Sequence, residues 1–292
     1  MFNIIKSDLY RLIRSKGFYI AIIVIIAMSA LSIVGMSAGR IGLAAGVSTE
    51  DVSSSEVLSD LAGNNVMDSE KLAKLIEAKT LNEIREVQKS FGGFELDKEI
   101  IAQNANLYYI FIVFVVIVLA KDFSNKSIKN TLSSAISRKK YYFSKLLLIL
   151  GISTCAILFN TYFTFFLNIA VNGKEFASSI GNITKITLYQ LPLLYGIICL
   201  LVCIAFTTRK TSMFNTISIP FIMVFQLVVM TITSLFKIKA DWFYKFELQN
   251  ALINLTNNPI NSYILKCSLL GIGYMIVFSI IGYYLFKKSE IK

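Results

Sequence analysis

Six long stretches of uncharged, mostly apolar residues constrain this 292-residue chain more than any other feature. A helix needs about 20 apolar residues to cross the roughly 30 Å hydrocarbon core of a bilayer, and every stretch is that long. They are residues 17–39, 100–120, 146–173, 186–208, 211–236 and 267–286. Charged residues make up only 16% of the chain, against about 25% in soluble domains. We therefore predict an all-α polytopic membrane protein, with residues 1–292 forming one transmembrane domain of six helices.

The positive charges gather on one side of these predicted spans. Most Lys and Arg residues lie in four short segments, which are residues 1–17, 121–145, 207–212 and 287–292. Segments rich in Lys and Arg face the cytoplasm, so we expect both termini to be cytoplasmic. Residues 40–99 hold more acidic than basic residues and are predicted to form an extracellular insertion. The net charge of +11 then follows from membrane topology, and no nucleic-acid partner is expected.

Shorter helices are predicted outside the spans. Residues 1–16 place apolar side chains at helical spacing opposite cations, which favours an amphipathic helix at the membrane interface over an ordinary basic flank. Within the insertion, the pattern of Asp68–Lys89 indicates one or two amphipathic helices. Residues 237–266 are interpreted as outer helices, with a turn signal at Asn257–Pro259.

Several kinds of chemistry are disfavoured by what the sequence lacks. The chain has no His, which removes His-based catalysis and His-ligated metals. It has no P-loop motif for nucleotides, and no charged residue lies within any of the six stretches. Ion-coupled carriers usually need intramembrane charges. We therefore expect no catalytic residue, metal or cofactor in this chain, and we expect its four cysteines to serve packing.

The loop Lys121–Lys145 is the most informative segment. Ser124 or Asn125 can cap a short helix, and Ile128, Leu132 and Ile136 recur every four residues on one face. A short amphipathic helix surrounded by cations suits a groove on a partner protein. A solvated basic loop explains the same residues equally well.

Parts of this loop resemble a pattern found in permease subunits of type-two ABC transporters, in the bacitracin and lantibiotic-immunity-like or peptide-exporter branch. The pattern runs through Asp122-Phe123, Ser127–Leu132, Ser137–Tyr141 and Lys145-Leu146. The chain departs from it at Lys126-Ser127, where Gly-Thr is usual, and at Ala135-Ile136, near where Pro is usual. The order of the predicted spans, interfacial helix, insertion and basic loop is similar to that family over nearly the whole chain.

The resemblance implies a permease of an ATP-driven exporter in the bacterial cytoplasmic membrane. Its partners would be two copies of an ATP-binding subunit, which carry the ATP and Mg, and a second permease chain in a homodimer or heterodimer. Its surroundings would be membrane lipid and its cargo an amphipathic peptide or drug. The loop would be the coupling helix that contacts the ATP-binding subunit, and the candidate contacts are Phe123, Ile128, Lys129, Leu132 and Arg138.

Polar residues inside the spans are further candidates. Asn160, Thr164 and Asn168 repeat every four residues in one span, and Asn215 and Gln226 lie in another. They are interpreted as a translocation path or a permease dimer interface, with hydrogen bonding between helices as the alternative. The alternative function is a non-transporting immunity or scaffold protein that binds peptides through residues 40–99.

Overall fold

The computed structural model describes residues 2–48, 104, 107–125, 127–128, 136–174, 177, 179–236, 248–257 and 261–288. All regular structure in these residues is helical, which confirms the all-α prediction for this part of the chain. The elements are α1 (Phe2–Ile13), α2 (Lys16–Ser48), α7 (Tyr108–Val115), the π-helical turn η2 (Val116–Ala120), α8 (Lys121–Ser124), α10 (Arg138–Asn172), α11 (Ile180–Thr208), α12 (Thr211–Phe236), α14 (Leu248–Asn257) and α15 (Asn261–Lys288).

Four of the described helices are long and apolar enough to cross a membrane, which marks the chain as a membrane protein. They are Lys16–Val34, Arg138–Val171, Ile180–Thr208 and Asn261–Lys288, and each overlaps a predicted span. The predicted span 211–236 coincides with α12, which is not among the four. The predicted span 100–120 is described as helix only over α7 and η2. The number of six spans therefore stays a prediction.

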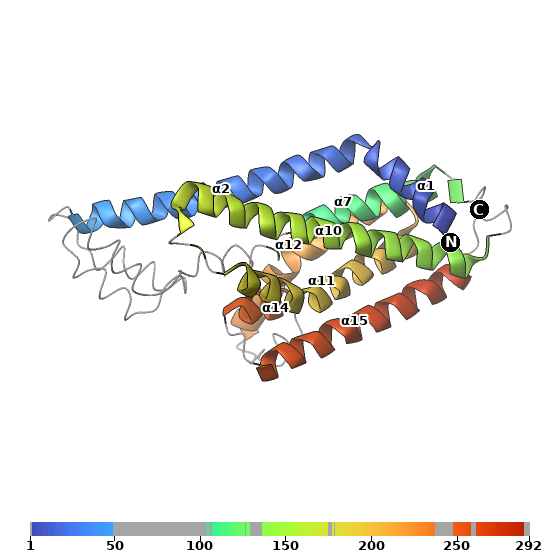
Figure 1. Cartoon of the computed structure of the whole chain (residues 1–292). Coiled ribbons are helices and arrows are strands. Elements are labelled where there is room, and N and C mark those ends of the chain that lie inside the picture. Colours follow the sequence, from blue (N-terminus) through green and yellow to red (C-terminus); the bar gives the residue numbers. More distant parts are fainter. Residues whose placement is uncertain are drawn as a thin grey trace.

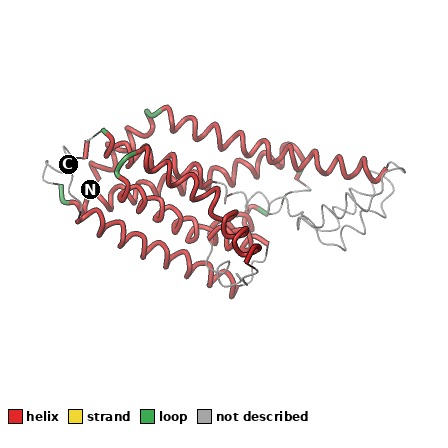
Figure 2. Tube along the Cα trace, turned by 180° about the vertical axis from the view of Figure 1, so that it is seen from behind, coloured by secondary structure: helices red, strands yellow, loops and turns green. Residues whose placement is uncertain are grey.

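The long helices lie side by side in a bundle. Figure 1 shows α2 and α15 on opposite sides of it, with α1 at the same end as the last turn of α15. The view from behind shows the same parallel arrangement (Figure 2). We call this end the base of the bundle. Helix α7 and turn η2 occupy the centre, where Phe111, Val115 and Leu119 are fully buried.

Serine caps explain why two helices begin before their apolar stretches. The Ser137 hydroxyl accepts a hydrogen bond from the Lys140 amide at 3.3 Å, so α10 starts at Arg138 rather than at residue 146. The Ser179 hydroxyl likewise accepts from the Asn182 amide at 3.3 Å, and α11 starts at Ile180. A capping hydroxyl satisfies an amide that the first helical turn leaves unpaired. The early start of α10 brings Tyr141 and Lys145 onto the helix at the base.

Helices α11 and α15 approach each other through glycine. A Cβ atom on Gly271 would overlap the backbone carbonyl of Pro192 and lie 2.6 Å from the Leu193 amide nitrogen. A Cβ atom on Gly196 would lie 3.2 Å from the Gly271 carbonyl oxygen. Small residues that allow such backbone contact are a common means of helix association in membranes. This crossing fixes α15 against α11.

Candidate functional site

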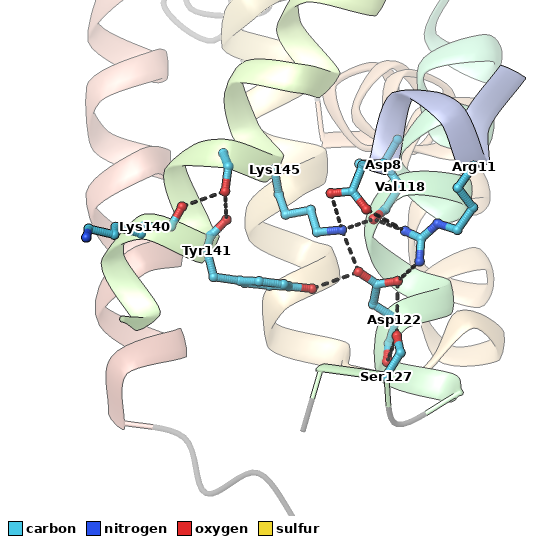
Figure 3. A network of polar contacts seen from close by, with 9 residues as sticks. Asp8, Arg11, Val118, Asp122, Ser127, Lys140, Tyr141 and Lys145 are labelled. Atoms are coloured by element: carbon cyan, nitrogen blue, oxygen red, sulfur yellow. Dashed lines mark hydrogen bonds and ion pairs between the residues drawn. The ribbon is translucent and has the colours of Figure 1, made fainter. Parts of the chain in front are cut away.

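Four charged side chains meet at the base of the bundle, three of them buried and the fourth, Arg11, exposed to solvent on one side. Asp8 and Arg11 come from α1, Asp122 from α8 and Lys145 from α10 (Figure 3). We call these four residues the base ion cluster. Lys145 is 1% exposed, Asp122 4% and Asp8 7%. Such burial requires the charges to be paired, because an isolated ion is strongly disfavoured away from water.

The pairing within the base ion cluster is complete and balanced. Lys145 Nζ lies 2.7 Å from Asp8 Oδ2 and 2.5 Å from Asp122 Oδ2. Arg11 Nη1 lies 2.5 Å from Asp122 Oδ1, and Arg11 Nη2 lies 3.1 Å from Asp8 Oδ1. Each cation thus contacts both carboxylates, and two positive charges cancel two negative ones. The cluster joins three segments that are far apart in the sequence.

Hydrogen bonds extend the cluster to neighbouring groups. The Val118 carbonyl in η2 accepts from Arg11 Nη2 at 3.2 Å and from Lys145 Nζ at 3.1 Å. A π-helical turn interrupts the regular α-helical ladder and often marks a functional position. The Tyr141 hydroxyl donates to Asp122 Oδ2 at 2.9 Å, and the Ser127 hydroxyl donates to Asp122 Oδ1 at 3.3 Å. Asp122 is therefore the most densely bonded member.

The two carboxyl groups differ in pKa although they share both cations. Burial acts to raise the pKa of Asp122, but Lys145 and Arg11 outweigh it and hold that pKa below its ordinary value. Burial raises the pKa of Asp8 above its ordinary value, because Lys145 and Arg11 only partly oppose it and Asp122 adds repulsion. Asp122 therefore stays ionised to lower pH than Asp8.

The two residues after Asp122 tie α8 to three further helices. The Phe123 ring meets the Phe206 ring of α11 edge-on at 5.7 Å between centroids, and the Phe286 ring of α15 at 6.4 Å. The Ser124 hydroxyl accepts a hydrogen bond at 3.0 Å from the amide of Thr211, the first residue of α12. Three consecutive residues thus connect α8 with α1, α10, α11, α12 and α15. A displacement of α8 has to move these helices or break the contacts.

The structure places three of the proposed coupling residues against the chain's own helices. Phe123 packs as described, and Ile128 is buried in the core. Arg138 Nη1 donates to the carbonyl oxygens of Phe286 at 3.3 Å and Lys287 at 2.6 Å, in the last turn of α15. A cation is favourable there because the last carbonyls of a helix lack intrahelical partners.

The remaining loop positions are only partly described. Lys129 and Leu132 lie outside the described residues, and Ile136 precedes α10 without being helical. The predicted helical face through Ile128 and Leu132 therefore does not continue to Ile136. Contact of the loop with an ATP-binding subunit stays a prediction.

A second polar network lies in the interior of the bundle. Asn160 Nδ2 donates to Asn104 Oδ1 at 2.9 Å, and Asn104 Nδ2 donates to Gln190 Oε1 at 3.0 Å. The Ser29 hydroxyl donates to Asn160 Oδ1 at 3.1 Å and accepts from the Thr164 hydroxyl at 3.0 Å. These bonds join α2, α10, α11 and the residue Asn104 that lies before α7. They are hydrogen bonds between helices, the alternative role considered for Asn160 and Thr164.

The other polar candidates do not meet at one place in the described structure. Asn168 is fully buried on α10. Asn215 Oδ1 on α12 is buried and has no hydrogen-bond partner among the described residues. Gln226 lies on α12, but its side chain is outside the described part. Their assignment to a translocation path or a permease interface stays a prediction.

Sequence reasoning singled out neither the base ion cluster nor Asn104 and Gln190 as sites. A signal for the cluster was present, because Asp8 and Asp122 are two of only three acidic residues in the basic segments. An isolated acid among cations is a candidate for a structural ion pair. Which cation pairs with it depends on how the helices pack.

Among the described residues, no group of three or more Cys, Asp or Glu side chains is placed to hold a metal ion.

Comparisons with known proteins give one match. The family model described as "Protein of unknown function (DUF2705)" matches residues 88–292. This range includes Asp122 and Lys145 but not the two cluster residues of α1. Searches of curated proteins and of solved structures found no match.

Proposed function

The chain belongs to the DUF2705 family of proteins of unknown function, and we propose that it is the membrane-spanning permease subunit of an ATP-driven ABC exporter. In this proposal a separate ATP-binding subunit, present in two copies with ATP and Mg, pushes on residues 125–137. Helix α8 passes the movement into the membrane. The observation that carries the proposal is the anchoring of α8 through Asp122, Phe123 and Ser124.

The strength of this anchoring favours movement of the helices as one body. Separation of α8 from α1 and α10 would expose or strand the buried carboxylate of Asp122. Removal of one partner from a buried ion pair is destabilising by about 3–5 kcal/mol. The aromatic contacts of Phe123 and the bond from Thr211 to Ser124 would be lost as well. Coupled movement of α8, α10 and α1 preserves all of these contacts.

The distribution of charge supports a cytoplasmic base. Cations are frequent in the helical segments of the base: Lys6 lies in α1 and Arg14 directly after it, Arg138, Lys139 and Lys140 begin α10, and Lys287 and Lys288 end α15. Because segments rich in Lys and Arg face the cytoplasm, the proposal has both termini on the cytoplasmic side of the bacterial cytoplasmic membrane. Uncharged spans suit an amphipathic peptide or antibiotic that enters from the bilayer. A homodimer or a pair with a second permease completes the exporter.

Site-specific photo-crosslinking in native membranes tests this function. A photoreactive residue at Lys129 is expected to crosslink to a polypeptide with a P-loop ATPase sequence. The matched control is Leu147, which is exposed on the apolar flank of α10 and should give no such product. An intact chain that crosslinks to no ATPase from position 129 would overturn the proposal. It would favour the non-transporting immunity or scaffold protein instead.

A further inference from the structure

An apolar groove opens between α1, α2 and α10. Its volume is about 570 Å³, and its walls include Leu9 and Ile13 of α1, Ile22 of α2 and Phe159 of α10. Ligand sites typically enclose about 300–1,000 Å³, so the groove is large enough for one ligand. Apart from the thiol of Cys155, its lining side chains are hydrocarbon or glycine. Its occupant must therefore present an apolar surface.

The groove has the length of one membrane leaflet. Along α10 it extends from Leu147 to Phe159, and at 1.5 Å per residue this is about 18 Å. One leaflet contributes about half of the roughly 30 Å hydrocarbon core. At the base the groove is bordered by α1, an amphipathic helix of 12 residues that is too short to span a bilayer. Leu9 and Ile13 of α1 are 39% and 45% exposed, so its apolar face is not fully covered.

Three cations lie close in sequence to the residues of α1 and α2 that line the groove. Lys6 and Arg14 follow the lining residues Ile5 and Ile13 directly, and Lys16 starts α2. Within the described residues, none of the three pairs with a carboxylate. Arg14 does donate to the Tyr10 hydroxyl at 2.6 Å, but its charge is not neutralised there. Their positive charges favour an anionic group beside α1 and the start of α2.

We propose that this groove binds one acyl chain of an anionic phospholipid, with the lipid phosphate among Lys6, Arg14 and Lys16. An apolar slot of one-leaflet length, lined in part by residues next to cations in α1, matches a molecule with an apolar tail and an anionic head. A second copy of the chain fits less well, because α1 packed against α1 would bring the same cations together. The proposal requires only that the chain lies in a membrane, so it does not depend on transport.

Native mass spectrometry of the purified chain tests the preference for the head group. The probes are phosphatidylglycerol and phosphatidylcholine with identical acyl chains. Because an interfacial cation contributes about 1 kcal/mol toward an anionic lipid, its removal corresponds to about five-fold in affinity. Lys6→Gln should weaken retention of phosphatidylglycerol by about five-fold and leave phosphatidylcholine unchanged. Equal retention of both lipids by the unaltered chain would overturn the proposal.

A groove-filling substitution tests the position of the acyl chain. Gly151 lines the groove, and a Cβ atom there meets nothing within 4 Å. Gly151→Leu should therefore fold normally and lose phosphatidylglycerol. The matched control is Gly273→Leu on α15, where a Cβ atom also meets nothing within 4 Å and which does not line the groove. Retention of the lipid by a monodisperse Gly151→Leu chain would place the lipid elsewhere.

Cys155 provides a second readout that needs no groove variant. It is the exposed cysteine, while Cys199, Cys203 and Cys267 are buried and should react slowly. Because Cys155 lines the groove, phosphatidylglycerol should slow its reaction with a maleimide more than phosphatidylcholine does. Protection by a second copy of the chain or by an amphipathic peptide, but not by phosphatidylglycerol, would contradict the lipid assignment.

Discussion

Substitution of Lys145 by methionine tests the balance of charge in the base ion cluster. Methionine keeps much of the length of the side chain and removes its charge. Lys145 Nζ contacts Asp8, Asp122 and the Val118 carbonyl. Without it, two buried carboxylates share Arg11 alone, and the cluster carries a net charge of −1. Removal of one partner of a buried pair is destabilising by about 3–5 kcal/mol, so we expect Lys145→Met to lower the free energy of unfolding by that amount.

A second substitution in the same chain should restore part of that stability. Asp8→Asn combined with Lys145→Met leaves the Arg11–Asp122 pair, which is neutral and has an Nη1–Oδ1 distance of 2.5 Å. Groups in one ion-pair network show interaction energies of about 0.5–3 kcal/mol. We expect the double variant to be about 1–3 kcal/mol more stable than Lys145→Met alone, because the amide at position 8 no longer adds an uncompensated buried charge.

Equilibrium unfolding in mixed micelles of mild detergent and sodium dodecyl sulfate measures these differences. Far-ultraviolet circular dichroism follows the loss of helix in the native chain, both single variants and the double variant. A Lys145→Met variant within about 1 kcal/mol of the native chain would contradict the pairing of Lys145 with Asp8 and Asp122, because a fully buried partner of two carboxylates cannot be removed at so small a cost. Strictly additive effects of the two substitutions would refute the shared network.

Two further predictions concern backbone contact and pH. Gly271→Ala should be destabilising by about 1–3 kcal/mol, because its Cβ would overlap the Pro192 carbonyl. The control is Gly273→Ala, whose Cβ meets nothing within 4 Å. Equal melting temperatures of the two variants would contradict the α11–α15 crossing. Because the pKa of Asp122 is lowered in the folded chain, its contribution to stability is complete above its unfolded pKa of about 3.9 and is lost as pH falls through the folded value. The stability difference between the native chain and Asp122→Asn should therefore shrink below about pH 4, and a difference that stays constant down to about pH 2 would contradict the assignment.

The helical nature of the apolar runs and of the amphipathic start was predicted correctly where the described structure tests it, whereas the helical face expected to reach Ile136 was not. Apolar runs of bilayer length predicted helices because a bilayer leaves a backbone few other options, and the predicted range 211–236 has the bounds of α12. The helical start of the chain corresponds to α1. The exact starts of α10 and α11 were missed by several residues. Their positions depend on the capping hydroxyls of Ser137 and Ser179 rather than on hydropathy.

Contacts distant in sequence were not predictable from one chain. The pairing of Arg11 with Asp122 joins residues 111 positions apart, and any cation near the base satisfies the same pattern. Ile128 shows the converse case. Its place on an amphipathic face suggested a surface for a partner, but its side chain is buried against the chain's own core. An amphipathic pattern indicates that the apolar face of a helix is buried, but it does not tell whether the same chain or another protein buries it.

Purification of the chain from gently solubilised native membranes, with its partners identified by mass spectrometry, shows whether an ATPase accompanies it. A permease of an ATP-driven exporter is expected to bring a stoichiometric partner that carries a P-loop ATPase sequence, and any second permease would be found in the same sample. A preparation that contains the intact chain but no ATPase, in each of several mild detergents, would contradict the claim that this protein is the membrane subunit of an ATP-driven exporter.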